Sequence, residues 1–159
     1  MVCLRLVLAL ALAVLWSGCV TPAPPAERAS EAARELNVSA RFGDVASVLE
    51  LTAPSMRERF QVRRADWGKE VRVVDVELAA LTLSDAKHAS VTIDFSWTRI
   101  DEGTLRTTRV VQFWEAVDGP WLLVREKRLT GDLGLFGEPV ARLETAPRPD
   151  VQFPTKVIP

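Results

Sequence analysis

The chain has 159 residues, of which 48% are hydrophobic and 26% are charged, and its formal net charge is −1. This near-neutral balance excludes the basic footprint that a nucleic-acid-binding protein needs. Lys and Arg alternate with Asp and Glu, as in MRERF and REKR, which indicates solvated faces of mixed charge. The length and the apolar content suit one domain with its own hydrophobic core.

An uninterrupted apolar run from Leu6 to Trp16 follows a single early positive charge. A helix of that length spans roughly 17 Å, which is short for a bilayer core of about 30 Å but typical of a secretory signal peptide. The small residues Ser17 and Gly18 follow the run and precede Cys19. The pattern predicts a signal peptide over residues 1–18 and disfavours a short buried helix.

The stretch LWSGC, which ends at Cys19, resembles the lipobox of bacterial lipoproteins, with Trp16 where that motif usually has Leu. The resemblance implies cleavage before Cys19 and a diacylglycerol on its sulfur; the alternative is ordinary cleavage near Gly18. A mature lipoprotein carries at least two acyl chains, which hold a protein firmly at a membrane. Val20 matches the sorting pattern for the outer membrane. We therefore expect a lipid anchor in the cell envelope, at the outer membrane and facing the periplasm.

The same interpretation accounts for both cysteines, because Cys3 leaves with the leader and Cys19 carries the lipid. The mature domain then has neither a disulfide nor a free thiol. Prolines predict an extended tether over residues 19–26. Four prolines in the stretch ETAPRPDVQFPTKVIP predict an irregular tail over residues 139–159. The folded domain accordingly spans residues 27–138.

The first half of this domain has helical periodicity. Small apolar residues recur at three- and four-residue spacing and predict one amphipathic helix: Ala29, Ala32, Ala33, Leu36 and Ala40. Gly43 ends this pattern, and Asp44 is the expected N-cap of a short second helix. Pro54 opens a third helix, which we expect to end near Trp67.

The second half has the alternation of β-strands. Strands are predicted over residues 71–83, 89–99, 104–117 and 121–129, joined by the turns SDAKHA, DEG and DG. In the first strand Val74, Val76, Leu78 and Ala80 alternate on one face, and a phase shift near Ala79 and Ala80 predicts a β-bulge. Helices followed by a four-stranded meander predict an α+β fold, with N-terminal helices packed on a strongly curved four-stranded antiparallel sheet.

Three segments, RFGDVASVLELTAPSMRERF, VTIDFSWTRID and VVQFWEAVDGPWLLV, resemble the nuclear transport factor 2-like superfamily over roughly residues 27–129. The resemblance implies a cone-shaped α+β domain. The leader, tether and domain together are similar to small bacterial envelope lipoproteins of unassigned function. The superfamily includes enzymes, ligand binders and proteins that pair through the open face of the sheet, so the resemblance does not choose a function.

Signals for catalysis are sparse. Enzymes that this fold resembles use Asp, His or Tyr, whereas this chain has no Tyr and one histidine, His88, in a polar turn. The residues show no metal-ligand spacing and no phosphate-binding loop, and GDLGLFG is predicted to be an ordinary loop. We expect no catalytic residue, no metal and no cofactor. The alternative is an acid–base enzyme that uses Asp94 or Glu115, because burial in a cone would raise the pKa of such a carboxylate.

The aromatic residues suggest where binding would occur. Trp67, Trp97, Trp114 and Trp121 either fill the core or, for Trp97 and Trp114, line a pocket or a pairing face. The candidate pocket or pairing residues are Phe95, Trp97, Arg99, Phe113, Trp114 and Glu115.

The strand from Leu105 to Val117 has apolar residues on both faces, which predicts that a tail or another subunit covers its second face. We therefore expect pairing with a second copy of the chain, or contact with an envelope protein. The leading functional hypothesis is a non-enzymatic lipoprotein that binds or assembles through its sheet face or cone. The alternative is a carrier of a small apolar ligand in the cone.

Overall fold

The computed structural model describes residues 22–140 of the chain. The predicted signal peptide, the lipidation site at Cys19 and most of the predicted tail, residues 139–159, therefore lie outside the described residues. The described part contains the whole of the predicted domain, residues 27–138, and the end of the predicted tether. Within residues 22–140, no helix combines the length and the apolar character needed to cross a bilayer.

The helices follow the sequence signals closely. Helix α2, Pro25–Phe42, begins with proline in its first turn and ends at Gly43, which adopts a left-handed φ of 76°. Helix α3, Val45–Glu50, has the predicted N-cap, because the Asp44 side chain accepts a hydrogen bond from the Ser47 N–H over 3.3 Å. The predicted third helix is a 3-10 turn, η1, Pro54–Met56, that continues into α4, Arg57–Arg63. It ends before Trp67, where the sequence indicated its end, because Arg64 leaves the helical conformation and a turn follows.

The four strands form one antiparallel meander in the order β1-β2-β3-β4. They are β1, Val71–Leu83; β2, His88–Arg99; β3, Leu105–Ala116; and β4, Trp121–Gly131. The bulge predicted in β1 is present, as a register shift between Leu78 and Ala80. Further shifts interrupt β1 and β4, and such shifts bend and twist the bulged strand. The predicted α+β fold with a strongly curved sheet is confirmed.

The face of β1 on which Val74 lies was predicted wrongly. A second register shift lies between Val73 and Asp75, where the sequence indicated regular alternation. The shift changes the parity of the strand, so Val71 and Val73 are buried whereas Val74 is 42% exposed. Beyond the bulge between Leu78 and Ala80, Ala80 is also exposed and lies away from the core. The sequence pattern does not reveal this shift. A bulge inserts one residue and so reverses which face the following side chains occupy, while the strand keeps the same apolar residues.

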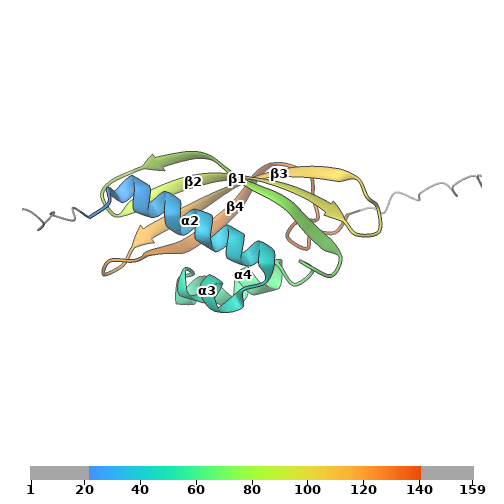
Figure 1. Ribbon diagram of the computed structural model, residues 1–159, viewed down its shortest axis with the longest axis horizontal. Coiled ribbons are helices and arrows are strands. Elements are labelled where there is room, and N and C mark those ends of the chain that lie inside the picture. Colours follow the sequence, from blue (N-terminus) through green and yellow to red (C-terminus); the bar gives the residue numbers. More distant parts are fainter. Residues whose placement is uncertain (1–21, 141–159) are drawn as a thin grey trace, which may run out of the picture.

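Figure 1 shows α2 crossing the curled sheet, with α3 and α4 near the C-terminal end of α2. The space between helices and sheet is filled by large side chains that are at most 1% exposed: Leu36, Phe95, Trp97, Trp114, Leu123 and Leu135. Leu135 comes from the segment after β4, which is a loop as predicted. This loop returns to the core, where Phe136 also packs, 5% exposed. The cone is therefore packed with the protein's own side chains.

Candidate functional site: a buried polar chain and two outer surfaces

A chain of polar side chains crosses the packed interior from α2 to Arg64, the C-cap residue of α4. Asn37 and Gln112 exchange two hydrogen bonds, with N–O distances of 3.0 and 2.9 Å. Gln112 Nε2 also donates to Glu126 Oε2 over 3.0 Å. Arg64 completes the chain with two parallel bonds to the Glu126 carboxylate, of 3.0 and 2.6 Å. All four side chains are at most 8% exposed, so the chain joins α2, β3, β4 and the C-cap of α4 within the core.

Glu126 is the electrostatic centre of this chain. Burial by itself raises the pKa of its carboxyl, but the nearby Arg64 charge, hydrogen bonds from Arg64 and Gln112, and the Arg63 charge together lower the pKa below its ordinary value. The Arg64 guanidinium is in turn 3.6 Å from the Phe60 ring centroid. Glu126 is therefore ionised and fully engaged at neutral pH.

The stretch REKR was predicted to be a solvated face of mixed charge, and for Glu126, which is 3% exposed, that prediction is wrong. In regular alternation Glu126 would lie on the face opposite Leu123. A register shift between Phe113 and Trp114 inserts one extra residue into β4, which turns Glu126 onto the buried face opposite Gln112. Gln112 itself was detectable, since it lies two residues from the buried Val110 and Trp114 on the same face of β3.

The residues predicted to form one pocket or pairing face lie in three places. Phe95, Trp97 and Trp114 lie on the covered face of the sheet, at most 1% exposed. Phe113 lies on the open face, where the Arg125 guanidinium is 4.0 Å from its ring centroid.

Glu115 is also on the open face and Arg99 is at the rim of the sheet. Arg99 nitrogens lie 3.3–3.4 Å from carboxylate oxygens of Glu70, Asp101 and Glu102, so carboxylates surround its charge. The predicted set therefore does not form a single site.

The four tryptophans divide between core and edge. Trp97, Trp114 and Trp121 are at most 3% exposed, and the Trp97 indole donates to the Thr108 hydroxyl over 2.9 Å. Trp67 is half-buried and donates to the Leu135 carbonyl over 2.7 Å. Trp67 alone of the four thus reaches the surface.

The two carboxylates considered as catalytic bases lie on the open face. Arg109 donates two hydrogen bonds of 2.6 Å to Asp94, and these bonds hold the pKa of Asp94 below its ordinary value. Glu115 lies 3.9 Å from Nε2 of His88, which is half exposed and contacts Asp85 over 2.9 Å. Both carboxylates are open to solvent, with side chains that are 34% exposed for Asp94 and 46% exposed for Glu115.

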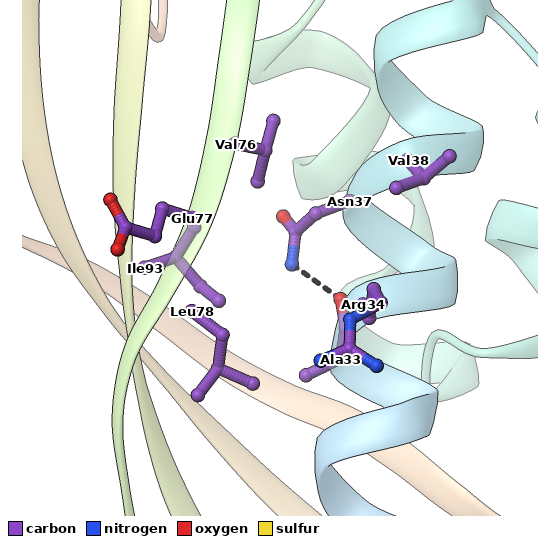
Figure 2. A pocket seen from close by; sticks show the side chains of 8 residues that line it. All are labelled: Ala33, Arg34, Asn37, Val38, Val76, Glu77, Leu78 and Ile93. Atoms are coloured by element: carbon purple, nitrogen blue, oxygen red, sulfur yellow. Dashed lines mark hydrogen bonds between the residues drawn. The ribbon is translucent and has the colours of Figure 1, made fainter.

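Grooves that open to solvent are found around the packed interior. Figure 2 shows one of about 270 Å³ between α2 and β1, with Asn37 at its wall and Val76 and Leu78 facing it. Another, of about 330 Å³, lies between the ends of α2, α3 and α4 and reaches Arg64 and Trp67. Within residues 22–140, no group of three or more His, Cys, Asp or Glu side chains could hold a metal ion.

No protein-family model and no curated protein matches the sequence. Among solved structures, a SEC-C motif-containing protein from Rhodopseudomonas palustris is similar, with a TM-score of 0.56 and 16% identity over 68% of this chain and 83% of that protein. A protein from Cytophaga hutchinsonii described as NTF2-like gives a TM-score of 0.48 and 14% identity, over 62% of this chain and 91% of its own. At such low identity, the similarity to the Rhodopseudomonas protein shows a shared fold alone.

Proposed function

We propose that this chain is a lipid-anchored protein of the bacterial cell envelope, without enzymatic activity of its own, that binds or assembles with another macromolecule. The packed interior is the observation that carries this proposal. Leu36, Phe95 and Trp97 are fully buried where a hollow cone would hold a substrate or an apolar cargo. Binding by an outer surface is the role that such a filled domain can perform.

The state of the carboxylates supports a role other than acid–base catalysis. A general base works best when its pKa lies near the operating pH. The pKa values of Glu126 and Asp94 are both held below their ordinary values, chiefly by arginine. Glu126 is also enclosed, so a substrate has no access to it.

The anchor is proposed from the leader and Cys19, and it is tested by replacing that cysteine. In a native bacterial host fed labelled palmitate, we expect the full chain to carry the label and to fractionate with the envelope membranes. Cys19→Ser should lose the label and leave the membrane fraction, because its thiol is the acceptor for the lipid. A Cys19→Ser protein that stays in the membrane fraction would refute the anchor.

The proposed partner is a second copy of the chain or an envelope protein, and the open face of the sheet is one surface for it. Phe113 and Val111 lie there, half-buried, beside the charged pair Asp94 and Arg109. An apolar strip within a charged surround is typical of interfaces between independently folded proteins.

A second candidate function is the carriage of a small apolar ligand. The groove of about 330 Å³ favours it, because Val48, Phe60 and Trp67 line that groove. Native mass spectrometry of protein extracted gently from the envelope distinguishes the two functions. A co-purifying apolar molecule of constant mass indicates a carrier, whereas a bare chain or a complex with a second protein supports the binding role.

A further inference from the structure

The turn between α2 and α3 exposes large apolar side chains. Phe42 is 74% exposed and Val45 is 52% exposed. The backbone between them is fixed, because Gly43 adopts a left-handed φ of 76° and the Asp44 N–H donates to the Ser39 carbonyl over 2.9 Å. Glycine accepts this conformation without steric cost, so the turn is a formed helix cap and not a frayed end. The two apolar side chains are therefore held out to solvent in a defined position.

Two grooves adjoin this turn, and Trp67 lines both of them. The groove of about 330 Å³ includes Val45 and Lys69, and a second groove of about 390 Å³ includes Phe42 and Arg72. We call the residues Phe42, Val45, Trp67, Lys69 and Arg72 the helix-end surface. Its apolar members come from two separate segments of the chain, the α2–α3 turn and Trp67, which the tertiary structure brings together.

The helix-end surface carries positive charge that is not neutralised. Lys69 and Arg72 form no ion pair with any carboxylate of residues 22–140. Among the described residues that line the two grooves, the acidic one is Asp44. Its carboxylate accepts hydrogen bonds from the Ser47 N–H and hydroxyl, over 3.3 and 2.6 Å, as the cap of α3. The surface therefore favours a negatively charged partner.

A buried donor without an acceptor lies at the same place. Arg64, which is 8% exposed, lines the groove of about 330 Å³. Its terminal nitrogens bind Glu126, but its Nε is buried and has no hydrogen-bond partner among the described residues. Such a donor has lost its water without gaining an acceptor. An incompletely satisfied polar group therefore lies in a residue that borders the helix-end surface.

We propose that the helix-end surface binds a protein segment in which an apolar side chain lies next to acidic residues. A small ligand in one groove would leave the other groove and one of the exposed side chains, Phe42 or Val45, uncovered. A protein segment can cover both, since specific protein interfaces bury about 800 Å² on each partner. This inference rests on the binding role proposed above, for which it names the surface and the chemistry of the partner.

The test is a titration of the full mature chain, held by its lipid in phosphatidylcholine nanodiscs. The probes are two synthetic hexapeptides, each with a central phenylalanine and leucine, flanked by glutamates in one and by lysines in the other. We expect saturable NMR shifts of the Gly43 amide and the Trp67 indole with the acidic peptide, and binding about tenfold weaker with the basic one.

Matched variants localise the effect. Phe42→Ser should weaken binding of the acidic peptide by about tenfold. Leu105→Ser, which alters a leucine that is 63% exposed on β3, should leave the binding unchanged. The double variant Lys69→Glu with Arg72→Glu should instead prefer the basic peptide, because the sign of the surface is reversed.

Equal binding of both peptides, no saturable shift with either, or full binding by Phe42→Ser would overturn the proposal. Shifts with decanoate but not with the acidic peptide would overturn it in favour of a small ligand. A photo-crosslinking residue placed in cells at Phe42 or at Phe113 distinguishes failure of the helix-end surface from failure of the binding role itself. Protein adducts at Phe113 alone would overturn the helix-end surface and preserve the binding role, whereas adducts at neither position would overturn both.

Discussion

Neutralising Glu126 should destabilise the fold strongly. Glu126→Gln keeps the size of the side chain but removes the charge that two Arg64 hydrogen bonds of 3.0 and 2.6 Å engage. The Arg64 guanidinium then stays buried without a counterion. Breaking one partner of a buried ion pair costs about 3–5 kcal/mol, which lowers the Tm of a domain this size by roughly 10–20 °C.

The matched control is Asp94→Asn, which removes a carboxylate bound by Arg109 through two hydrogen bonds of 2.6 Å, but at the surface. Solvent and salt screen an exposed pair, so we expect a much smaller change in Tm. Urea denaturation and thermal melts followed by circular dichroism measure both variants. Equal destabilisation by Glu126→Gln and Asp94→Asn would refute the reasoning, because it attributes the larger loss at Glu126 to the burial of that ion pair and its hydrogen bonds.

The pH dependence provides a second check. The folded-state pKa of Glu126 is lowered from its ordinary value of about 4.3, so its contribution to stability is full above that value and is lost as the pH falls through the folded pKa. Asp44, Asp85 and Asp94 are shifted in the same direction. The difference between wild type and Glu126→Gln therefore isolates Glu126, and it should shrink from pH 6 toward strongly acidic pH. A constant difference would contradict the assignment.

Three further predictions concern the sheet and the loop that fills it. Gly131→Ala should destabilise the fold by more than the roughly 1–3 kcal/mol typical of a strained backbone position, because at φ 95° the added Cβ would lie 2.3 Å from the Thr107 carbonyl oxygen. The control is Gly103→Ala, at φ 68° with open space around it, which should lower the free energy of unfolding less in the same urea assay. Leu135→Ala should cost about 2–5 kcal/mol, since this side chain is 1% exposed, and an unchanged urea midpoint would show that the loop is not part of the core. If the open face pairs two copies, light scattering should give a dimer that Phe113→Glu converts to a monomer, and a wild-type monomer would exclude pairing there.

The sequence alone was sufficient for the local elements and their order. The apolar stripe of α2, the cap at Asp44 and the alternation in β2 each depend on residues a few positions apart, so local periodicity and capping chemistry reveal them. The bulge near Ala80 was visible for the same reason. A four-stranded meander must bury one face of its sheet, and the helices that precede it are the elements available to cover that face. This order of elements therefore predicted the layered fold.

The tertiary structure decided which side chains meet. A single extra residue in β4 turns Glu126 inward, and no local pattern distinguishes that bulge from regular alternation. The pairing of Glu126 with Arg64 joins residues 62 positions apart, and the helix-end surface joins the end of α2 to Trp67 and β1. Such contacts depend on how the helices lie across the curled sheet. The sequence therefore determined the elements, whereas three-dimensional packing determined that the cone is filled and where the surface is exposed.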